Sequence, residues 1–350
     1  KILALPFLFM VLFNNGPEFL MNKDVIPFIW NKIVIPVTTI VPVGSIFLSL
    51  IISYGLMEFV GVFMRPVMKP IWKTPGRSAI DAVASFVGSY SLALLITNRV
   101  YKEGKYTTKE AIIIATGFST VSATFMVIVA KTLDLMDSWN LYFWLTVIVT
   151  FLVTAITARI YPIRNKSDAY FENQEGDIEK DIPKDKFKVA FNEGMEVCAN
   201  SGTILENVII NLKDGVMLAF NIGPSLMAIG TLGIVLANHT PIFDWIGYLV
   251  YPFTLISGFE EPLLTAKALA LGIAEMFLPA VLVTKLSFEV KMLVAITCVS
   301  EVLFFSASIP CMMATDIPIS FKDYLIIWFE RVVLSILVSI PLIYLVKVLM

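Results

Sequence analysis

Long apolar blocks separated by short polar segments make up most of the chain. They run at about 1–13, 25–63, 79–98, 111–132, 141–161, 216–237, 242–257, 262–283, 292–313 and 324–349. Several reach the length of about 20 apolar residues that a helix needs to cross a bilayer with every backbone polar group bonded inside the segment. The block at 25–63 is too long for one span and carries three prolines, so we divide it into an interfacial piece at 25–38 and a membrane helix at 40–63. The pattern predicts an all-α polytopic membrane protein.

One stretch in the middle of the chain interrupts the apolar pattern. Residues 163–190 are hydrophilic, and residues 187–213 mix apolar and polar positions as an amphipathic helix on the membrane surface does. The alternative for the second stretch is a solvated end of the linker. We therefore expect four parts: an N-terminal membrane segment with an interfacial helix (1–38), a first repeat (39–162), a cytoplasmic connector with an amphipathic helix (163–215) and a second repeat (216–350). Because the sequence starts at Lys1 inside an apolar stretch, we also expect further sequence upstream.

The two halves of the chain resemble each other in short segments that occur in the same order. FVGVFMRP at 59–66 matches WIGYLVYP at 245–252 in its glycine and its final proline. Farther on, ATGFSTV at 115–121 lies over ITCVSEV at 296–302, which places Glu301 opposite a threonine. Internal repeats of membrane segments are typical of secondary transporters.

Two basic loops on either side of residues 79–98 decide the topology. The loops at 64–78 and 99–110 each hold four Lys or Arg, and a crossing segment between them would put them on opposite sides, against the positive-inside rule. A segment that turns back near Val87-Gly88-Ser89 leaves two arms of about ten residues, each about 15 Å long, which is about half the bilayer core. We therefore predict a re-entrant hairpin with both loops in the cytoplasm.

The remaining orientation follows from this hairpin. Residues 111–132 then run outward, residues 141–161 return, and the connector is cytoplasmic. The second half consequently starts inside, whereas the first starts outside, so the two repeats are inverted. The second hairpin, around 258–284, should open to the exterior.

Polar side chains inside apolar blocks mark the candidate site. A charge in mid-span costs about 2.5–3.5 kcal/mol on insertion scales, so such groups tend to line substrate or ion pathways. The blocks at 111–132 and 292–313 each carry a polar stripe on one expected helical face, although single hydroxyls also bond to their own or neighbouring helices. Glu275 and Glu301 are the ion-coupling candidates because a buried carboxyl needs a partner, an ion or a proton. The substrate-binding candidates are Ser89, Ser91, Thr116, Ser119, Thr120, Thr297, Ser300, Glu301 and Glu275.

Four further candidates lie at the open ends of the hairpins, opposite their tips, and we call these open ends the mouths: Arg77, Asp81, Glu260 and Glu261. A half-helix that starts near Ser89 would direct backbone N–H groups and its positive dipole end toward the membrane centre, where a solute carboxylate, phosphate or hydroxyl can bind. Glu260 and Glu261 precede Pro262, so helix capping explains them as well as a functional role does. At the first mouth, Arg77 and Asp81 either pair across one helical turn or contact the solute.

Composition excludes several other classes of function. The chain is 57% apolar and 15% charged, against about 45–50% and 25% in soluble domains, and its net charge of −2 argues against nucleic acid. The three cysteines are far apart and there is one histidine, so we expect no metal, no cofactor and no enzyme activity. No GxxxxGK[ST] motif is present, which argues against direct ATP drive.

One run of residues carries a family resemblance. PGRSAIDAVASFVGSYSLALLITNRVYKEGKYTTKEAIIIATGFSTVSATF at 75–125 resembles the YjiH family of multi-pass bacterial inner-membrane proteins, which contain the Gate, or nucleoside recognition, domain. Gate domains also occur in ferrous iron transporters and spore maturation proteins. They are related to concentrative nucleoside transporters, whose two inverted hairpin repeats place the site between hairpin tips and partly unwound helices. The glutamine-threonine-glutamate pattern of those hairpins is absent here, since Gly88-Ser89-Tyr90-Ser91 lacks the acid.

Together these features predict a secondary transporter of a small polar solute, either nucleoside-like or like an amino acid or peptide. It would work by alternating access with H⁺ or Na⁺ coupling through Glu301 or Glu275. The alternative is a non-transporting Gate-domain subunit of a larger complex, similar to spore maturation proteins. The expected partners of the protein are the bilayer, the solute, the coupling ion, and either a second copy of the chain or a second Gate-domain protein.

Overall fold

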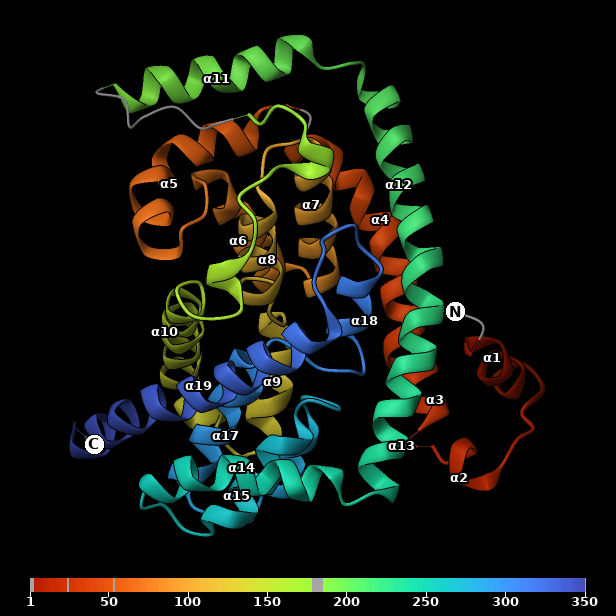
Figure 1. Cartoon of the computed structure of the whole chain (residues 1–350), viewed down its shortest axis with the longest axis vertical. Helices are drawn as coiled ribbons and strands as arrows, with labels where there is room; N and C mark the ends of the chain where they lie inside the picture. The colour runs from red at the N-terminus through yellow and green to blue at the C-terminus, as the bar shows by residue number, and fades with distance from the viewer. Residues whose placement is uncertain (1–2, 24, 53, 178–184, 350) are drawn as a thin grey trace.

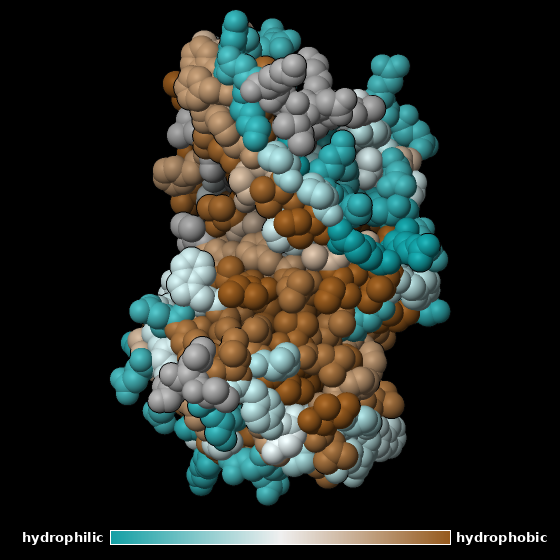
Figure 2. Space-filling model, turned by 90° about the vertical axis from the view of Figure 1, so that its left-hand side faces the viewer, coloured by the Kyte–Doolittle hydropathy of each residue, from teal (hydrophilic) through white to brown (hydrophobic). Residues whose placement is uncertain are grey.

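The computed structural model describes residues 3–23, 25–52, 54–177 and 185–349, and these are mostly helical. In those ranges four helices are long and apolar enough to cross a membrane: Glu18–Phe47, Met136–Thr157, Ile204–Leu236 and Phe321–Lys347. The face drawn in Figure 2 carries hydrophobic side chains across its middle and hydrophilic ones toward both ends. The length of the helices and this surface pattern fit a protein embedded in a bilayer.

A pair of long helices stands at one side of the molecule (Figure 1). After α1 (Ala4–Phe13) and α2 (Glu18–Met21), the chain runs through α3 (Ile26–Phe28) and the π-helical turn η1 (Ile29–Val34) into α4 (Ile35–Ile52). Beside α4 lies α12 (Ile204–Ser225), which continues through η6 (Leu226–Gly230) into α13 (Thr231–His239). A Cβ on Gly215 would lie 2.5 Å from the Ser45 hydroxyl, so a small residue lets these two backbones approach closely.

The predicted division of residues 25–63 is wrong in its position. The helix does not end near residue 38 but continues to Ile52, and the next helix, α5 (Leu56–Trp72), starts after Gly55. Gly55 has a φ of +77° and its Cα faces the Gly194 backbone so closely that a Cβ would overlap it. The break therefore comes from a left-handed glycine and a close backbone contact, not from the prolines used to place it.

The two repeats contain the same elements in the same order. The first has α5, η2 (Gly76–Ser78), the hairpin α6 (Ala79–Val87) and α7 (Tyr90–Lys102), then α8 (Thr108–Gly117), α9 (Ala123–Thr132), η3 (Met136–Ser138) and α10 (Trp139–Thr157). The second has α14 (Ile242–Ile256), the hairpin α15 (Pro262–Leu271) and α16 (Leu278–Leu282), then α17 (Phe288–Ser300), α18 (Ser308–Met313) and α19 (Phe321–Leu349). Both predicted hairpins are present.

The glycines of the matched segments permit the same close packing in each repeat. Gly61 on α5 faces the backbone nitrogen of Arg77, which a Cβ would approach to 3.1 Å. Gly247 on α14 faces Lys267, whose Cγ would lie 2.8 Å from a Cβ. In both repeats a glycine thus lets the first arm of the hairpin, or the turn leading into it, pack against the preceding helix.

Ion pairs at the two ends of the molecule show that the repeats are inverted. At the connector end the pairs are Lys109–Asp168 (2.8 Å), Lys166–Asp323 (2.5 Å) and Lys102–Asp316 (3.3 Å). At the opposite end they are Lys291–Asp134 (3.8 Å) and Lys347–Glu289 (2.6 Å). Consequently α8 and α19 start at the connector end, whereas α17 starts at the other end and α10 begins next to Asp134 there.

The connector ends in a helix that lies across the molecule. Figure 1 shows α11 (Lys186–Asn200) almost at a right angle to α12. The stretch 187–213, expected to be a single amphipathic segment, is thus divided, because the membrane helix already starts at Ile204. Phe187, Phe191 and Met195 are exposed on α11, which suits a helix at a membrane surface. Short turns η4 (Ile163–Asn165) and η5 (Phe171–Asn173) precede it.

Candidate functional site

Each repeat contains a helix that is broken near the middle of the molecule. The segments 118–122 and 301–307 are unwound, so the expectation of continuous helices at 111–132 and 292–313 is wrong, and the polar stripes do not form uninterrupted helical faces. Both breaks start with the same tight turn, in which the Thr120 nitrogen donates to the Phe118 carbonyl (2.8 Å) and the Leu303 nitrogen to the Glu301 carbonyl (2.7 Å). When the two repeats are aligned on this turn, Glu301 corresponds to Phe118. The sequence alignment matches it to Thr120, two positions farther along.

The second break holds a strained backbone. Val302 has a φ of +62°, a left-handed conformation that is unfavourable for a β-branched residue. It is held because the Phe305 nitrogen donates to the Ile273 carbonyl (2.6 Å) and the Ser306 nitrogen to the Ala274 carbonyl (2.9 Å). The tip of the second hairpin thus pairs with the unwound segment of its own repeat.

The first hairpin turns at Gly88 and Ser89, as predicted. The Ser89 hydroxyl accepts from the Leu92 nitrogen (3.2 Å), which caps α7, and it lies 3.0 Å from the Ser91 hydroxyl. From the first arm, the Ser85 hydroxyl donates to the Thr120 carbonyl in the first break. This hairpin therefore also bonds to the unwound segment of its own repeat.

Aromatic pairs connect each hairpin tip to the broken helix of the other repeat. The Tyr90 ring packs edge-on against Phe304 with 5.9 Å between centroids, and the Phe277 ring packs edge-on against Phe125 at 6.2 Å. The first break also contacts the last turn of α17, because the Thr120 hydroxyl donates to the Val299 carbonyl (3.2 Å). The hairpin tips and the breaks therefore form one centre shared by both repeats.

The carboxyl candidates lie at this centre. Glu275 is in the tip of the second hairpin, is 5% exposed, and accepts from the Phe277 nitrogen (2.6 Å). Glu301 is fully buried, and its carboxylate lies so close to Gly272 that a Cβ there would be 2.4 Å from Oε2. Oε2 accepts from the Trp328 indole (3.1 Å), whereas Oε1 has no hydrogen-bond partner among the described residues.

The hydroxyl candidates divide into two groups. Thr116 and Thr297 donate to carbonyls of their own helices, at Ile112 (2.7 Å) and Leu293 (2.8 Å), which fits the alternative of bonding within the helix. The others lie at the centre or its edge. The buried Ser119 hydroxyl has no hydrogen-bond partner within the part of the chain that the structure describes, and the Ser300 hydroxyl lies 2.6 Å from that of Ser335. Ser89, Ser91 and Glu275 thus lie at the hairpin tips, Ser119, Thr120 and Glu301 in the breaks, and Ser300 at the end of α17.

Sequence reasoning missed the part of the centre that α19 contributes. Besides Trp328, α19 supplies Arg331, which is fully buried. Its Nε donates to the Ser300 carbonyl (2.8 Å) and its Nη1 to the Thr154 hydroxyl on α10 (3.1 Å). The signal was in the sequence, because an arginine within the last apolar block is an intramembrane charge of the kind that marks functional sites.

The comparisons with known proteins agree with this architecture. A family model described as Gate, nucleoside recognition, matches residues 34–136. The chain is also 32% identical over 333 residues to an uncharacterized protein of Alkalihalophilus pseudofirmus, which covers 94% of this chain and 72% of that protein. The chain belongs to the Gate-domain family.

Among solved structures, this Gate-domain protein is similar to a doubly substituted variant of CNTnw, a concentrative nucleoside transporter, in an outward-facing state. The TM-score is 0.59 at 14% sequence identity, over 98% of this chain and 86% of the other. The likeness confirms the predicted fold of two inverted hairpin repeats in a multi-pass membrane protein.

The residues at the hairpin mouths bond to neighbouring segments. Asp81 accepts from the Thr97 hydroxyl (2.6 Å) and the Tyr106 hydroxyl (2.7 Å). Arg77 pairs with Asp177 in the connector (2.9 Å).

At the other mouth, the Glu260 carboxylate accepts from the Ser287 nitrogen at the start of α17. Glu261 is exposed just before α15. Neither glutamate lies at the centre between the repeats.

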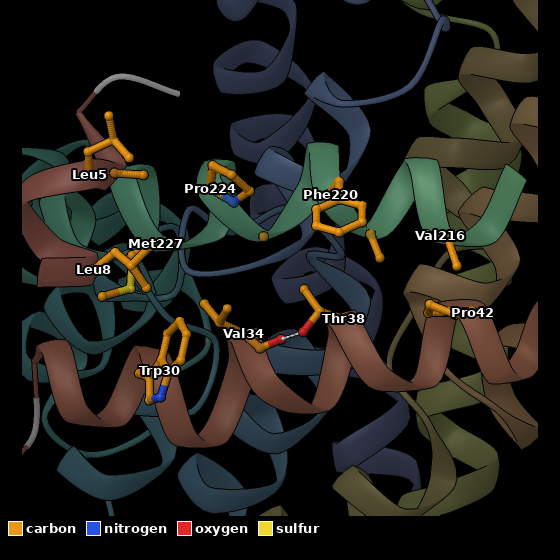
Figure 3. A pocket seen from close by; sticks show the side chains of 13 residues that line it. Leu5, Leu8, Trp30, Val34, Thr38, Pro42, Val216, Phe220, Pro224 and Met227 are labelled. Carbon is orange, nitrogen blue, oxygen red and sulfur yellow. Dashed lines mark hydrogen bonds between the residues drawn. The ribbon is translucent and has the colours of Figure 1, made fainter. Parts of the chain in front are cut away.

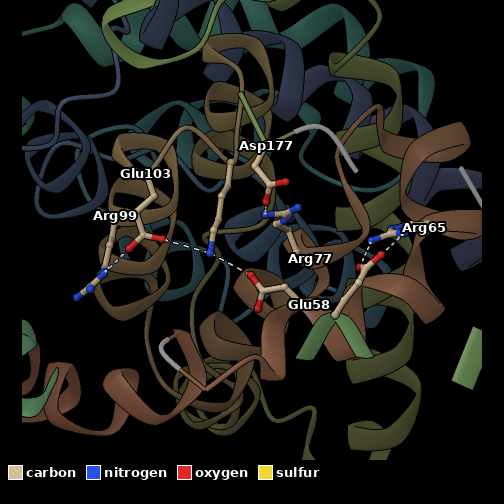
Figure 4. A network of polar contacts seen from close by, with 8 residues as sticks. Glu58, Arg65, Arg77, Arg99, Glu103 and Asp177 are labelled. Carbon is tan, nitrogen blue, oxygen red and sulfur yellow. Dashed lines mark hydrogen bonds and ion pairs between the residues drawn. The ribbon is translucent and has the colours of Figure 1, made fainter. Parts of the chain in front are cut away.

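Figure 4 shows that Arg77 belongs to a set of ion pairs at the connector end. Lys105 lies between Glu58 (3.0 Å) and Glu103 (3.4 Å), and Arg65 pairs with Glu193 of α11 (2.5 Å). These pairs tie α5, the first hairpin and α11 together. The polar contacts at this mouth thus hold its elements in place.

A cavity of about 470 Å³ lies away from the centre, between α1, α4 and α12 (Figure 3). Apart from the Thr38 hydroxyl, which donates to the Val34 carbonyl (2.6 Å), its lining is apolar or aromatic and includes Leu8, Trp30 and Phe220. Such a lining suits hydrocarbon rather than a polar solute.

Proposed function

We propose that this Gate-domain protein is a secondary transporter of a small polar solute of the nucleoside-like kind, working by alternating access in the cytoplasmic membrane of a bacterium. The observation that carries the proposal is the centre at which both hairpin tips meet both broken helices. Such discontinuous helices at the interface of inverted repeats are where transporters hold substrate and coupling ion. The likeness to CNTnw, a structure in an outward-facing state, supports the same reading.

The contacts at the centre suggest how access alternates. Each hairpin tip is hydrogen-bonded to the break of its own repeat, through Ser85 or through Ile273 and Ala274, and meets the other repeat in an aromatic pair. At its outer end the first hairpin also bonds to Asp316 of the second repeat, through Asn98 (2.9 Å) and Lys102 (3.3 Å). An aromatic pair adds only about 0.5–1.5 kcal/mol beyond its buried area. A hairpin tip can therefore separate from the opposite repeat at modest cost, and the first hairpin must in addition release its contacts with Asp316 before the centre opens to one side.

The chemistry of the centre suits a solute rich in hydroxyl and amide groups. Hydroxyls such as Ser89, Ser91 and Ser119 donate and accept, so they match the ribose and base edges of a nucleoside. A carboxylate solute would use the amino end of α7 instead. Glu301, one of whose carboxylate oxygens has no partner in the described ranges, and Glu275 are the groups that we expect to exchange the coupling ion, H⁺ or Na⁺.

Uptake into liposomes that contain the purified protein tests the proposal. Radiolabelled uridine, adenosine, amino acids and dipeptides are supplied with an imposed H⁺ or Na⁺ gradient, using the wild type, Glu301→Gln and, as a matched control at the mouth, Glu260→Gln. We expect gradient-dependent uptake of a nucleoside by the wild type and the control, and uptake without gradient dependence by Glu301→Gln. Undiminished gradient dependence in Glu301→Gln contradicts the coupling role. Failure of the folded wild type to take up any of these solutes favours a non-transporting Gate-domain subunit.

A further inference from the structure

The buried Arg331 lies beside the ends of α8 and α17, the first halves of the two broken helices. It comes ten residues after the start of α19, whose first turn pairs with the connector through Asp323. At a rise of 1.5 Å per residue this is about 15 Å along the axis of α19, which runs obliquely to the long helices α4 and α12 (Figure 1), and the side chain is fully buried there. An arginine at such a buried position is costly unless the protein uses its charge.

The guanidinium joins the carboxyl ends of both half-helices. Its Nε donates to the carbonyl of Ser300, the last residue of α17 (2.8 Å). Its Nη1 donates to the Thr154 hydroxyl (3.1 Å), which lies 3.0 Å from the carbonyl of Gly117, the last residue of α8. The last carbonyls of a helix lack intrahelical partners and carry partial negative charge. The guanidinium thus bonds the end of α17 directly and reaches the end of α8 through the Thr154 hydroxyl, which also lies 2.7 Å from the Thr150 carbonyl.

The carboxylate of Glu301 adds negative charge beside these helix ends. It follows Ser300 directly, and Trp328, one turn before Arg331 on the same helix, donates to it (3.1 Å). A third side chain of this α19 face, Ser335, lies 2.6 Å from the Ser300 hydroxyl. The α19 face thus contacts the end of α17 with an indole, a guanidinium and a hydroxyl.

Carboxyl ends of broken helices are where transporters with inverted repeats coordinate Na⁺ or H⁺. We propose that Arg331 is a built-in cation beside these helix ends and takes the place of a Na⁺, so that the protein needs no Na⁺ for stability and, of the two coupling ions named above, uses H⁺ in its cycle. The role in a cycle rests on the transport function proposed above, whereas the cation site does not. A guanidinium suits the task because it is permanently charged and its planar set of donors reaches several acceptors at once.

Removing the guanidinium should create a site for a small cation. Arg331→Ala leaves the Ser300 carbonyl and the Thr154 hydroxyl, which accept from the guanidinium, beside a space that a guanidinium ion or Na⁺ can fill. We expect the unfolding midpoint of the detergent-purified variant to fall by about 5–10 °C in choline chloride. At least half of the loss should return in guanidinium or sodium chloride at equal millimolar concentration. The wild type and Arg164→Ala, which removes an exposed arginine, should respond to neither cation.

Three results would overturn the proposal: a stable Arg331→Ala with an unchanged midpoint, a destabilised one that no cation restores, or a wild type that Na⁺ stabilises more than choline does.

If Arg331→Ala is not recovered from membranes, Arg331→Lys and Arg331→Met replace it. Recovery of the lysine variant alone supports the proposal, and a methionine variant with the wild-type midpoint contradicts it. If neither is recovered, the response of the wild type to Na⁺ decides. Since these measurements need no solute, they can succeed even where uptake fails.

Discussion

Gly272 is the position at which one added methyl group should disturb the centre most selectively. Its φ of −55° suits alanine, so Gly272→Ala strains no backbone dihedral. The new Cβ would, however, lie 2.4 Å from Oε2 and 2.6 Å from Oε1 of Glu301, closer than real Cβ contacts. The carboxylate must move away from the hairpin tip, and the indole of Trp328 then loses its acceptor.

The expected cost has two parts. Overpacking of a buried site costs about 1–3 kcal/mol, and an unpaired buried indole N–H adds about 1–3 kcal/mol. At about 2–4 °C per kcal/mol for mid-sized domains, the unfolding midpoint should fall by several degrees. Gly202→Ala is the matched control, because its Cβ would approach only the flexible side chains of Glu206 and Asn207.

A double variant tests the cause of the loss. Glu301→Asp shortens the side chain by one methylene and makes room for the new methyl group, so Gly272→Ala with Glu301→Asp should lose less stability than the two single variants together. We expect a coupling of about 1 kcal/mol or more in unfolding of the purified protein, which is within the range for contacting residues. A midpoint of Gly272→Ala equal to that of Gly202→Ala, or strict additivity in the double variant, would refute the placement of Glu301 against this hairpin.

Three further predictions concern the rest of the molecule. Thr154→Val should cost about 1–3 kcal/mol in unfolding because it leaves a guanidinium donor unpaired, whereas Thr146→Val, which loses a bond to its own helix, should cost much less; equal losses contradict the bridge. The hydrogen bond from Lys347 holds the pKa of Glu289 below its usual 4.5, so the folded state binds fewer protons than the unfolded state. The stability that Glu289→Gln removes should therefore be present above pH 4.5 and vanish as the pH falls below it; a pH-independent difference in midpoints speaks against this pair. Arg65→Gln removes the ion pair to α11 and should speed limited proteolysis of the connector, and unchanged cleavage would show that the pair does not hold α11.

The hairpins were predictable because the bilayer imposes rules that a sequence displays. The loops at 64–78 and 99–110 are both basic, so a crossing at 79–98 conflicts with the positive-inside rule. That single inference also predicted the inversion of the repeats. The matched glycines, Gly61 and Gly247, carried a further signal, since both permit the same close packing.

The breaks in α8–α9 and α17–α18 were not predictable from local signals. The segments 118–122 and 301–307 contain no glycine and no proline, and their backbone groups bond instead to other segments, as Thr120 does to Ser85 and Phe305 to Ile273. Tertiary contacts therefore overrule helix propensity there. Arg331 was missed for a different reason, because we read the last apolar block as a span and did not apply to it the argument that singled out Glu301.

Solute counterflow in liposomes that contain only this chain tests the proposed transport function most directly. The liposomes are loaded with an unlabelled nucleoside and diluted into a labelled one, without any ion gradient, so that coupling is removed and the alternation of the two repeats alone is measured. We expect a transient accumulation of label inside, which disappears in Gly272→Ala and persists in Gly202→Ala. Label that never exceeds its level in protein-free liposomes, with folded protein and a full panel of nucleosides, would contradict the proposed function.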